Sequence, residues 1–160
     1  MTKMDDKTLN GVIAYDDSRH DDYLFRVSVK AIVVNGDGHI LVVKETGRDW
    51  WDFPGGGLDH GESIKEALSR ELYEEVGFKG DIVEYEPIHV SEPHILHEFN
   101  MYQMRLTFLV KTSNLNFEPG IDGDEVMFAD PNDFKNSTSR TDRNLYEYSQ
   151  LALMRRGLIK

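Results

Sequence analysis

The segment from Ser63 to Gly77 carries the start signal, the length and the end signal of a single helix. Ser63 and Glu66 form a Ser-x-x-Glu capping box, and neither Gly nor Pro interrupts the chain before Val76. Gly77 suits the position just after a helix, where a left-handed backbone ends the last turn. We therefore expect a helix over residues 63–76, on which the direction of each side chain follows from its number.

Acidic side chains fall within the apolar face of this expected helix. At about 100° per residue, four side chains outline that face: Ile64, Ala67, Leu68 and Leu72. Glu71 and Glu75 lie inside the apolar arc and Glu74 lies at its edge, whereas Glu66 points the opposite way. Carboxylates turned toward a protein interior need compensation, which one divalent cation can give to all three. Hard oxygen ligands favour Mg²⁺, with Mn²⁺ as a substitute.

A second interpretation needs no metal. In it, the three glutamates only pair with nearby basic side chains, for which the candidates are Arg70, Lys44 and Arg48. The surrounding pattern favours the metal site. Nine residues match every fixed position of the Nudix box: Gly56, Glu62, Arg70, Glu71, Leu72, Glu74, Glu75, Gly77 and Phe78. The segment, with the run at residues 51–57 before it, therefore resembles the Nudix hydrolase family (MutT-like).

The resemblance implies an α+β fold, a Nudix-type α/β/α sandwich around a mixed β-sheet. Strand-like runs are consistent with it: residues 27–34, 40–43, 82–85, 88–90, 100–110 and 125–128. The turn at residues 35–38 predicts a hairpin between the first two runs. A second helix is expected at residues 142–156. The predicted organisation is an amino-terminal extension over residues 1–24 and a single domain over 25–160 that ends in this helix.

The resemblance also implies roles for the acidic residues. Glu74 and Glu75 would be metal ligands, Glu71 would be a ligand or orient the attacking water, and the Gly56 carbonyl would contribute to the metal site. A later acid completes such sites in family members. Glu125 is the first choice for it, and three other acids compete: Asp122, Asp124 and Glu118. Glu62 and Arg70 are expected to support the site, as an ion pair that orients the loop or by a direct role.

Several further residues are candidates for binding substrate. Gly55 and Gly57 would let backbone amides approach a phosphate. Arg26 and Lys44 would neutralise phosphate oxygens, with Lys30, Arg48 and Arg105 as alternatives. Trp51 could stack on a nucleobase, as could Trp50, although aromatic side chains beside a glycine loop also serve to pack that loop.

The amino-acid composition argues against some classes of binding partner. The net charge of −11 argues against binding nucleic acid polymers or membrane surfaces, because both need a basic patch. It is compatible with a small nucleotide held through cations. The chain has no cysteine, and its amino terminus lacks the apolar core of a signal peptide, so a cytoplasmic location is expected. A homodimer is compatible with the extension, which could swap onto a partner.

The resemblance to Nudix hydrolases implies Mg²⁺-dependent hydrolysis of a diphosphate bond in a nucleoside diphosphate linked to another moiety. The substrate classes left open are nucleoside triphosphates, oxidised nucleotides, ADP-ribose and nucleotide sugars. One alternative is a Nudix-like module that senses nucleotides without turning them over. Another is a structural cation site in an interaction protein, which leaves the glycine loop unexplained.

Overall fold

The computed structural model describes residues 8–9, 12–13, 25–97 and 101–160. Within the extension expected over residues 1–24, it describes only two short antiparallel strands, β1 (Thr8–Leu9) and β2 (Val12–Ile13). The rest of the extension lies outside the described residues.

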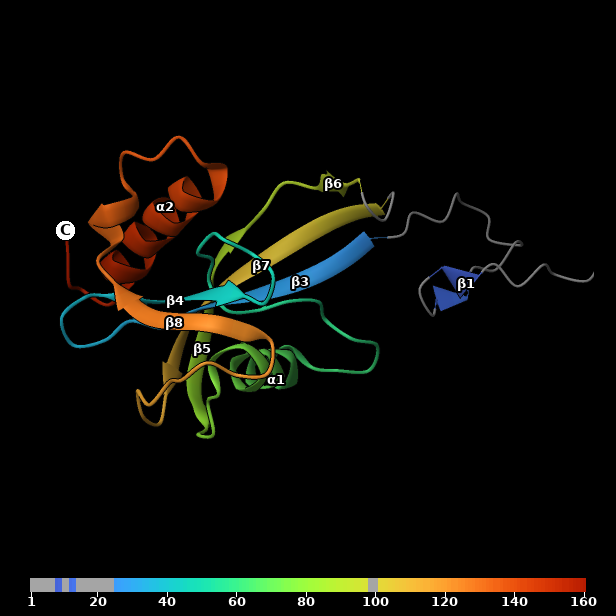
Figure 1. Ribbon diagram of the computed structural model, residues 1–160, viewed down its shortest axis with the longest axis horizontal. Coiled ribbons are helices and arrows are strands. Elements are labelled where there is room, and N and C mark those ends of the chain that lie inside the picture. The colour runs from blue at the N-terminus through green and yellow to red at the C-terminus, as the bar shows by residue number, and fades with distance from the viewer. Residues whose placement is uncertain (1–7, 10–11, 14–24, 98–100) are drawn as a thin grey trace, which may run out of the picture.

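Two β-sheets lie between two helices (Figure 1). In the larger sheet, β7 (Met101–Thr112) lies between β3 (Phe25–Ile32), to which it is parallel, and two antiparallel strands, β5 (Ile82–Val90) and β6 (His94–Leu96). In the smaller sheet, β4 (Ile40–Glu45) pairs antiparallel with β8 (Gly123–Ala129). The helices are α1 (Ile64–Val76) and α2 (Arg140–Arg155), and a 3-10 turn spans Pro131–Phe134. The predicted α/β/α sandwich around a mixed sheet is confirmed.

The predicted hairpin between residues 27–34 and 40–43 is wrong for most of its length. The two strands meet only near the turn, where Val34 pairs with Ile40 and the Leu41 amide donates to the Val33 carbonyl at 2.9 Å. Beyond that point β3 pairs with β7 in eight consecutive register positions, and β4 pairs with β8. Both strands pair with these distant partners because each then forms a longer ladder of backbone hydrogen bonds. The turn signal in the local sequence carries no information about partners elsewhere in the chain.

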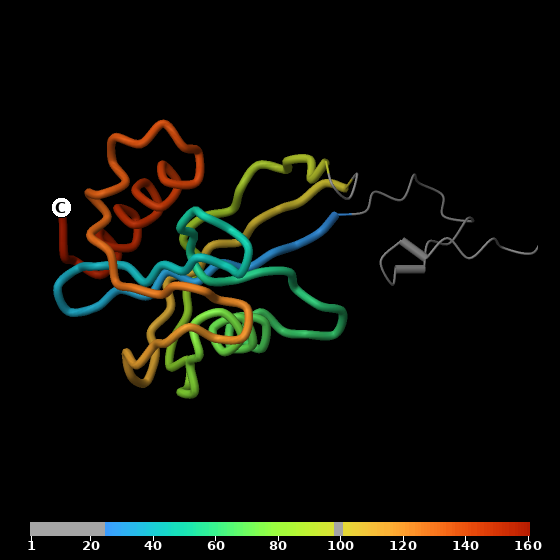
Figure 2. Tube along the Cα trace, viewed as in Figure 1, coloured from blue at the N-terminus to red at the C-terminus, as the bar shows by residue number. Residues whose placement is uncertain are grey.

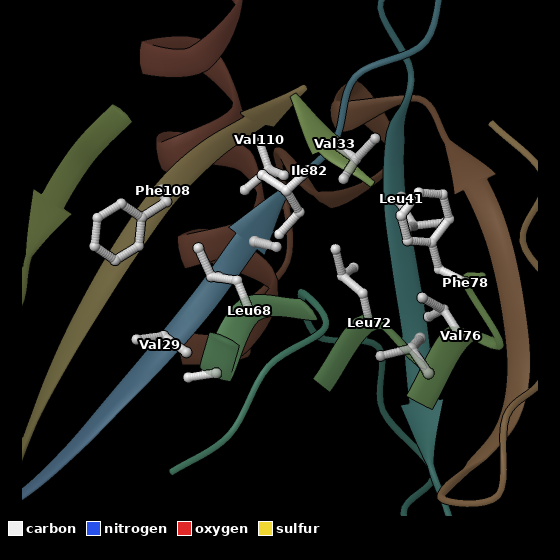
Figure 3. Packing of buried hydrophobic residues seen from close by; sticks show 13 residues of the cluster. Val29, Val33, Leu41, Leu68, Leu72, Val76, Phe78, Ile82, Phe108 and Val110 are labelled. Atoms are coloured by element: carbon white, nitrogen blue, oxygen red, sulfur yellow. The ribbon is translucent and has the colours of Figure 1, made fainter. Parts of the chain in front are cut away.

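Helix α1 forms as the sequence predicts. The Ser63 hydroxyl accepts from the Glu66 amide at 3.2 Å, and the Glu66 carboxylate accepts from the Ser63 amide at 2.8 Å. Gly77 ends the helix with φ 59°. The apolar face of α1 packs on one face of the sheets, where Leu68 and Leu72 meet Val29 and Phe108 (Figure 3).

Helix α2 covers the opposite face of the sheets. Leu145 and Ala152 on this helix are fully buried and pack in a second cluster with Ile32 and Val42. Ile32 follows Ser28 and Lys30 at the two-residue spacing of a strand, so all three side chains lie on one face of β3. Helix α2 covers only the apolar end of that face, and the polar end opens into a cleft. No helix among the described residues combines the length and the apolar composition that a bilayer span requires.

Candidate active site

A cleft of about 980 Å³ lies over the polar end of β3 and β7. The segment between β4 and α1 forms one wall, and Figure 2 shows it running back along β3. Three hydrogen bonds fix it there: Ala31 amide to Pro54 carbonyl, Val29 amide to Gly56 carbonyl, and Leu58 amide to Val27 carbonyl, at 2.8, 2.8 and 2.9 Å. The glycine loop, residues 55–57, is thereby held beside the carboxyl-terminal half of α1.

Glu71 and Glu75 reach the cleft from the buried side of α1, with only 8% and 5% of their surface exposed. Glu74 is half-buried. The Gly55 amide donates to the Glu75 carboxylate at 2.8 Å, and a Cβ at Gly56 would lie 2.5 Å from a Glu71 carboxylate oxygen. Gly55 has φ 137°, which disfavours other residues. The loop can approach the acids this closely only because it consists of glycine.

Burial changes the protonation of these acids. Desolvation raises the pKa of Glu75 to about 8, although the charge of Lys30 and the Gly55 amide oppose the shift. Burial also raises the pKa of Glu71 above its ordinary value, against the effect of Arg70. Two carboxylates with unfavourable ionisation therefore face the same loop.

Lys30 lies beneath the cleft and is only 4% exposed. Its ammonium donates to the Phe53 carbonyl at 2.9 Å and lies 3.1 Å from Asp52 and 3.6 Å from Glu45. Burial lowers the pKa of Lys30, but the charges of Asp52, Glu75 and Glu45 outweigh it and raise the pKa above its ordinary value. The sequence marked Lys30 only as one of five basic candidates. The position of this lysine within a strand-like run, directly between Val29 and Ala31, was the signal for its buried position.

Arg70 links the start of α1 to the acids. It donates to Glu62 at 2.8 and 2.9 Å, to the Gly57 carbonyl at 2.9 Å and to Glu71 at 2.7 Å. A weaker bond reaches Glu74 at 3.2 Å. The hydrogen bond from Arg70 holds the pKa of Glu62 below its ordinary value. The expected Glu62–Arg70 ion pair is confirmed, and Arg70 is also the basic partner of Glu71 and Glu74 that the metal-free interpretation names.

The loop before β8 caps the carboxyl-terminal end of α1. The amides of Glu118, Gly120 and Asp122 donate to the carbonyls of Val76, Glu75 and Glu74 at 3.1, 3.1 and 2.9 Å. Helix carbonyls that usually lack a partner in the chain are thus satisfied. This contact also brings the Asp122 side chain to the lining of the cleft.

Among the predicted catalytic acids and phosphate-binding residues, two lie outside the cleft. Glu125 and Lys44 face each other across β8 and β4 and form an ion pair at 2.9 Å, and neither lines the cleft. Glu45, the next residue of β4, lines the cleft and pairs with Gly123, because the register shifts there by one extra residue of β8, Asp124. Among the competing acids, Asp124 accepts hydrogen bonds from Thr46 and Gly47, and Glu118 lies 3.5 Å from Lys79.

The aromatic and basic candidates also divide. Trp51 lies under the Lys44 ammonium, 4.8 Å from its ring centroid, and packs against the second core cluster. Trp50 lines the cleft in its place, with the Arg48 guanidinium 5.5 Å from its ring. Arg26 and the alternative Arg105 line the cleft as well. The structure therefore brings together the glycine loop, the three helix acids and Arg26, but leaves out Lys44, Trp51 and Glu125.

Comparison with known proteins identifies the family. The NUDIX domain family matches residues 24–148, which is most of the chain. The chain belongs to the Nudix family. Solved Nudix folds resemble it: a MutT protein from Methanosarcina mazei Go1 has a TM-score of 0.62 at 19% identity, covering 87% of this chain and 99% of that one. A MutT NUDIX hydrolase from Burkholderia pseudomallei has a TM-score of 0.63 at 22% identity, covering 78% and 98%.

Curated relatives match over a shorter segment of this Nudix chain. An RNA pyrophosphohydrolase of Shewanella frigidimarina is 47% identical over 60 residues, which is 38% of this chain and 35% of that protein. An RNA pyrophosphohydrolase of Aeromonas hydrophila is 46% identical over 59 residues, covering 37% and 34%. The match thus spans about a third of the length of these relatives.

The Nudix acids have the donor chemistry of a site for a hard divalent cation, since carboxylate oxygens surround the glycine loop. Their present positions do not enclose an ion: among the described residues, no three His, Cys, Asp or Glu side chains form a cluster able to hold one. The Arg70 guanidinium donates hydrogen bonds to the carboxylates of Glu71 and Glu74, and the Gly56 carbonyl accepts a hydrogen bond from the Val29 amide. Each of these two carboxylates keeps one oxygen that Arg70 does not contact, so the acids could hold a cation together with Glu75.

Proposed function

We propose that this protein hydrolyses a diphosphate bond in a nucleoside diphosphate linked to another moiety, in a reaction that requires Mg²⁺ and for which Mn²⁺ can substitute. The observation that carries the proposal is the burial of Glu75 beside the glycine loop, where the Gly55 amide donates to its carboxylate. A buried carboxylate of this kind is costly unless a cation accompanies it. Membership of the Nudix family supports the reaction class.

Glu75, Glu74 and Glu71 would hold the cation at the carboxyl-terminal half of α1. Mg²⁺ held by these residues would supply positive charge to phosphoryl oxygens and would lower the pKa of a bound water. The oxygen of the water forms a bond to one phosphorus, and the bond from that phosphorus to the bridging oxygen breaks. The leaving phosphate keeps the bonding electrons. One proton of the water passes to a carboxylate of the cleft, and the second is released to solvent from the phosphate that the water forms. Gly55 and Gly57 would let the substrate's phosphates approach the backbone.

Asp122 is the better placed late acid for accepting a proton from that water. It lines the cleft, whereas Glu125 is paired with Lys44 outside it. Asp122→Asn should therefore lower kcat by about a hundredfold, the lower end of the range for one general base. Glu125→Gln is the matched control and should retain most of the turnover. The opposite ranking of the two variants would restore Glu125 to the role that the sequence suggested.

Small nucleotides are the favoured substrates. The relatives named RNA pyrophosphohydrolase raise RNA 5′ ends as a second class, but they match this chain over only 38% of its length. A net charge of −11 disfavours polymer binding, which depends on contacts between basic side chains and phosphates. Cytoplasmic location and a homodimer stay predictions from the sequence.

The decisive experiment measures phosphate and pyrophosphate release, with and without Mg²⁺. The panel contains nucleoside triphosphates, oxidised dGTP, ADP-ribose, nucleotide sugars and 5′-triphosphorylated RNA. We expect metal-dependent turnover of at least one small nucleotide. In Glu75→Gln, turnover should fall about a thousandfold, because the variant keeps the shape and removes a ligand charge. Glu66→Gln, on the exposed face of α1, is the control and should stay within about twofold of the wild type.

Two other results would change the conclusion. Near-normal turnover in Glu75→Gln would show that the Glu75 carboxylate is not needed for hydrolysis. Nucleotide binding without turnover of any substrate would favour the alternative of a sensing module.

A further inference from the structure

The floor of the cleft holds two arginines that form no ion pair within the described residues. Arg26 lies on β3 and Arg105 on β7, and both line the cleft. The other basic groups of the cleft are already neutralised, since Lys30 lies 3.1 Å from Asp52 and Arg48 lies 2.7 Å from Glu45. The protein has a net charge of −11, yet these two guanidinium groups lie in the same cleft and neither forms an ion pair within the described residues. Together they form a local site for an anion.

Buried polar atoms beside these arginines also lack partners. In the part of the chain that the structure describes, three buried side-chain atoms have no hydrogen bond: Ser28 Oγ, Arg105 Nε and Thr107 Oγ1. Ser28 and Thr107 are 2% and 1% exposed. Ser28 is the register partner of Arg105, and Lys30 is that of Thr107, so these groups share one face of the β3–β7 pair. Buried donors of this kind are normally satisfied, which points to a ligand with acceptor oxygens.

The position of this row relates it to the helix acids. Ser28 forms a bridge with Gly57, and a Cβ added to Gly57 would collide with the Arg26 guanidinium. The row therefore begins at the glycine loop that faces Glu71 and Glu75, and it extends across the sheet to Arg105. A group bound by Arg105 would lie next to a diphosphate bound at the loop.

We propose that Arg105, together with Arg26 and the Ser28 hydroxyl, forms a subsite for a third phosphoryl group of the substrate. The proposal rests on the proposed function and narrows its substrate class. Guanidinium groups bind phosphate oxygens by paired, charge-assisted hydrogen bonds, and a hydroxyl adds a further donor. The hydroxyl-rich moiety of a nucleotide sugar or of ADP-ribose cannot use two positive charges. The enzyme therefore selects nucleoside triphosphates over substrates that carry only a diphosphate.

Steady-state kinetics of Arg105→Gln test this subsite. With saturating Mg²⁺, kcat and KM are measured for a nucleoside triphosphate and for the diphosphate of the same nucleoside. The wild type should prefer the triphosphate, mainly through a lower KM. In the variant, KM for the triphosphate should rise about ten- to a hundredfold, the loss expected for a charged hydrogen bond, so that the preference disappears. Arg105→Lys, which keeps the charge, should restore part of the preference.

Arg143→Gln is the matched control. It removes the same charge from an exposed position on α2 and should leave the ratio between the two substrates unchanged. An equal rise in KM for both substrates would overturn the proposal, because Arg105 would then not distinguish phosphate number. A change in base preference at constant phosphate number would also overturn it and assign Arg105 to the nucleobase.

Binding separates this proposal from the hydrolase assignment. Calorimetry on Glu75→Gln with Mg²⁺ compares a nucleoside triphosphate with the matching diphosphate, and then repeats the comparison after adding Arg105→Gln. Tighter triphosphate binding that depends on Arg105, together with no Mg²⁺-dependent turnover of any substrate by the wild type, would support the subsite and refute the hydrolase. Turnover without such a difference would support the hydrolase and refute the subsite.

Discussion

One face of the β3–β7 pair has two ends with opposite chemistry. At one end, Ile32 and Leu109 are register partners that contribute to the cluster under α2. At the other end, Lys30 and Thr107, and then Ser28 and Arg105, are the register partners that floor or underlie the cleft. The two strands, the alternating direction of their side chains and their pairing are the same at both ends. The ends differ in the side chains they carry and in whether helix α2 covers them.

The comparison shows how a continuous sheet can support both stability and function. At the apolar end, side chains such as Leu145 complete a packed interior. At the polar end, buried groups such as Ser28 Oγ lack partners within the described residues, which lowers stability. The rigid apolar end holds the polar end in position. Each of the following predictions tests whether the two ends have these separate roles.

Lys30→Met should have the largest effect on stability. The substitution leaves Asp52 and Glu75 without their shared cation in a buried position and should lower the free energy of unfolding by about 4 kcal/mol. Urea denaturation measures the loss. Lys111→Met is the control, because Lys111 forms only an exposed pair with Glu84 at 3.8 Å and should lose less than about 1 kcal/mol. Equal losses in the two variants would refute the role of Lys30.

Leu145→Ala tests the apolar end. Leu145 is fully buried, so the cavity should lower the free energy of unfolding by about 3 kcal/mol. The kcat of the folded fraction should change little, since α2 covers the end of the face away from the helix acids. Leu151→Ala, at a site that is 41% exposed on the same helix, should cost less than about 1 kcal/mol. A selective loss of kcat in Leu145→Ala would show that the ends are not separable.

The pH dependence of stability tests the polar end without metal. The pKa of Glu75 is about 8 in the folded protein against an ordinary value of 4.5, so the folded state holds this proton more tightly. The stability that this bound proton gives to the folded state is therefore lost as the pH rises from 4.5 through 8. Between pH 5.5 and 7.5 the free energy of unfolding in EDTA should fall by roughly 2 kcal/mol more in the wild type than in Glu75→Gln.

Mg²⁺ should reduce that difference in pH dependence, because a cation favours the ionised carboxylate. Identical pH profiles of the wild type and Glu75→Gln in EDTA would contradict the assignment of the shift to Glu75.

Ser28→Ala should have the smallest effect and the opposite sign. It removes a buried hydroxyl that has no partner among the described residues, so the free energy of unfolding should rise by up to about 1 kcal/mol. Ser149→Ala is the comparison at the apolar end. The Ser149 hydroxyl donates to the Leu145 carbonyl, so its loss should lower stability by less than about 1 kcal/mol. A loss of stability in Ser28→Ala would show that Ser28 has a structural partner.

The sequence was sufficient to predict α1 and the direction of its acids. Capping and helical periodicity are local properties, so Ser63 and Gly77 define the bounds of the helix, and the position of Glu75 follows from its residue number. The fold class followed from the Nudix box, whose nine matching positions all lie within residues 56–78.

Long-range pairing could not be predicted in the same way. The parallel pairing of β3 with β7 joins residues more than 70 positions apart, and it determines that Arg105 meets Ser28. The choice of Glu125 could not take account of its pairing with Lys44 or of the extra residue Asp124 in β8, which interrupts the strand alternation among the late acids. The carboxylates around Lys30 come from three different segments, so only the folded chain brings them together.

The loop that caps α1 has a consequence for ligand affinity. Helix ends usually fray, and Glu74 and Glu75 belong to the last turn of α1. Here the amides of Glu118, Gly120 and Asp122 close that turn. The backbone of these acids is therefore ordered before any ligand arrives, so binding costs side-chain rearrangement but little backbone entropy.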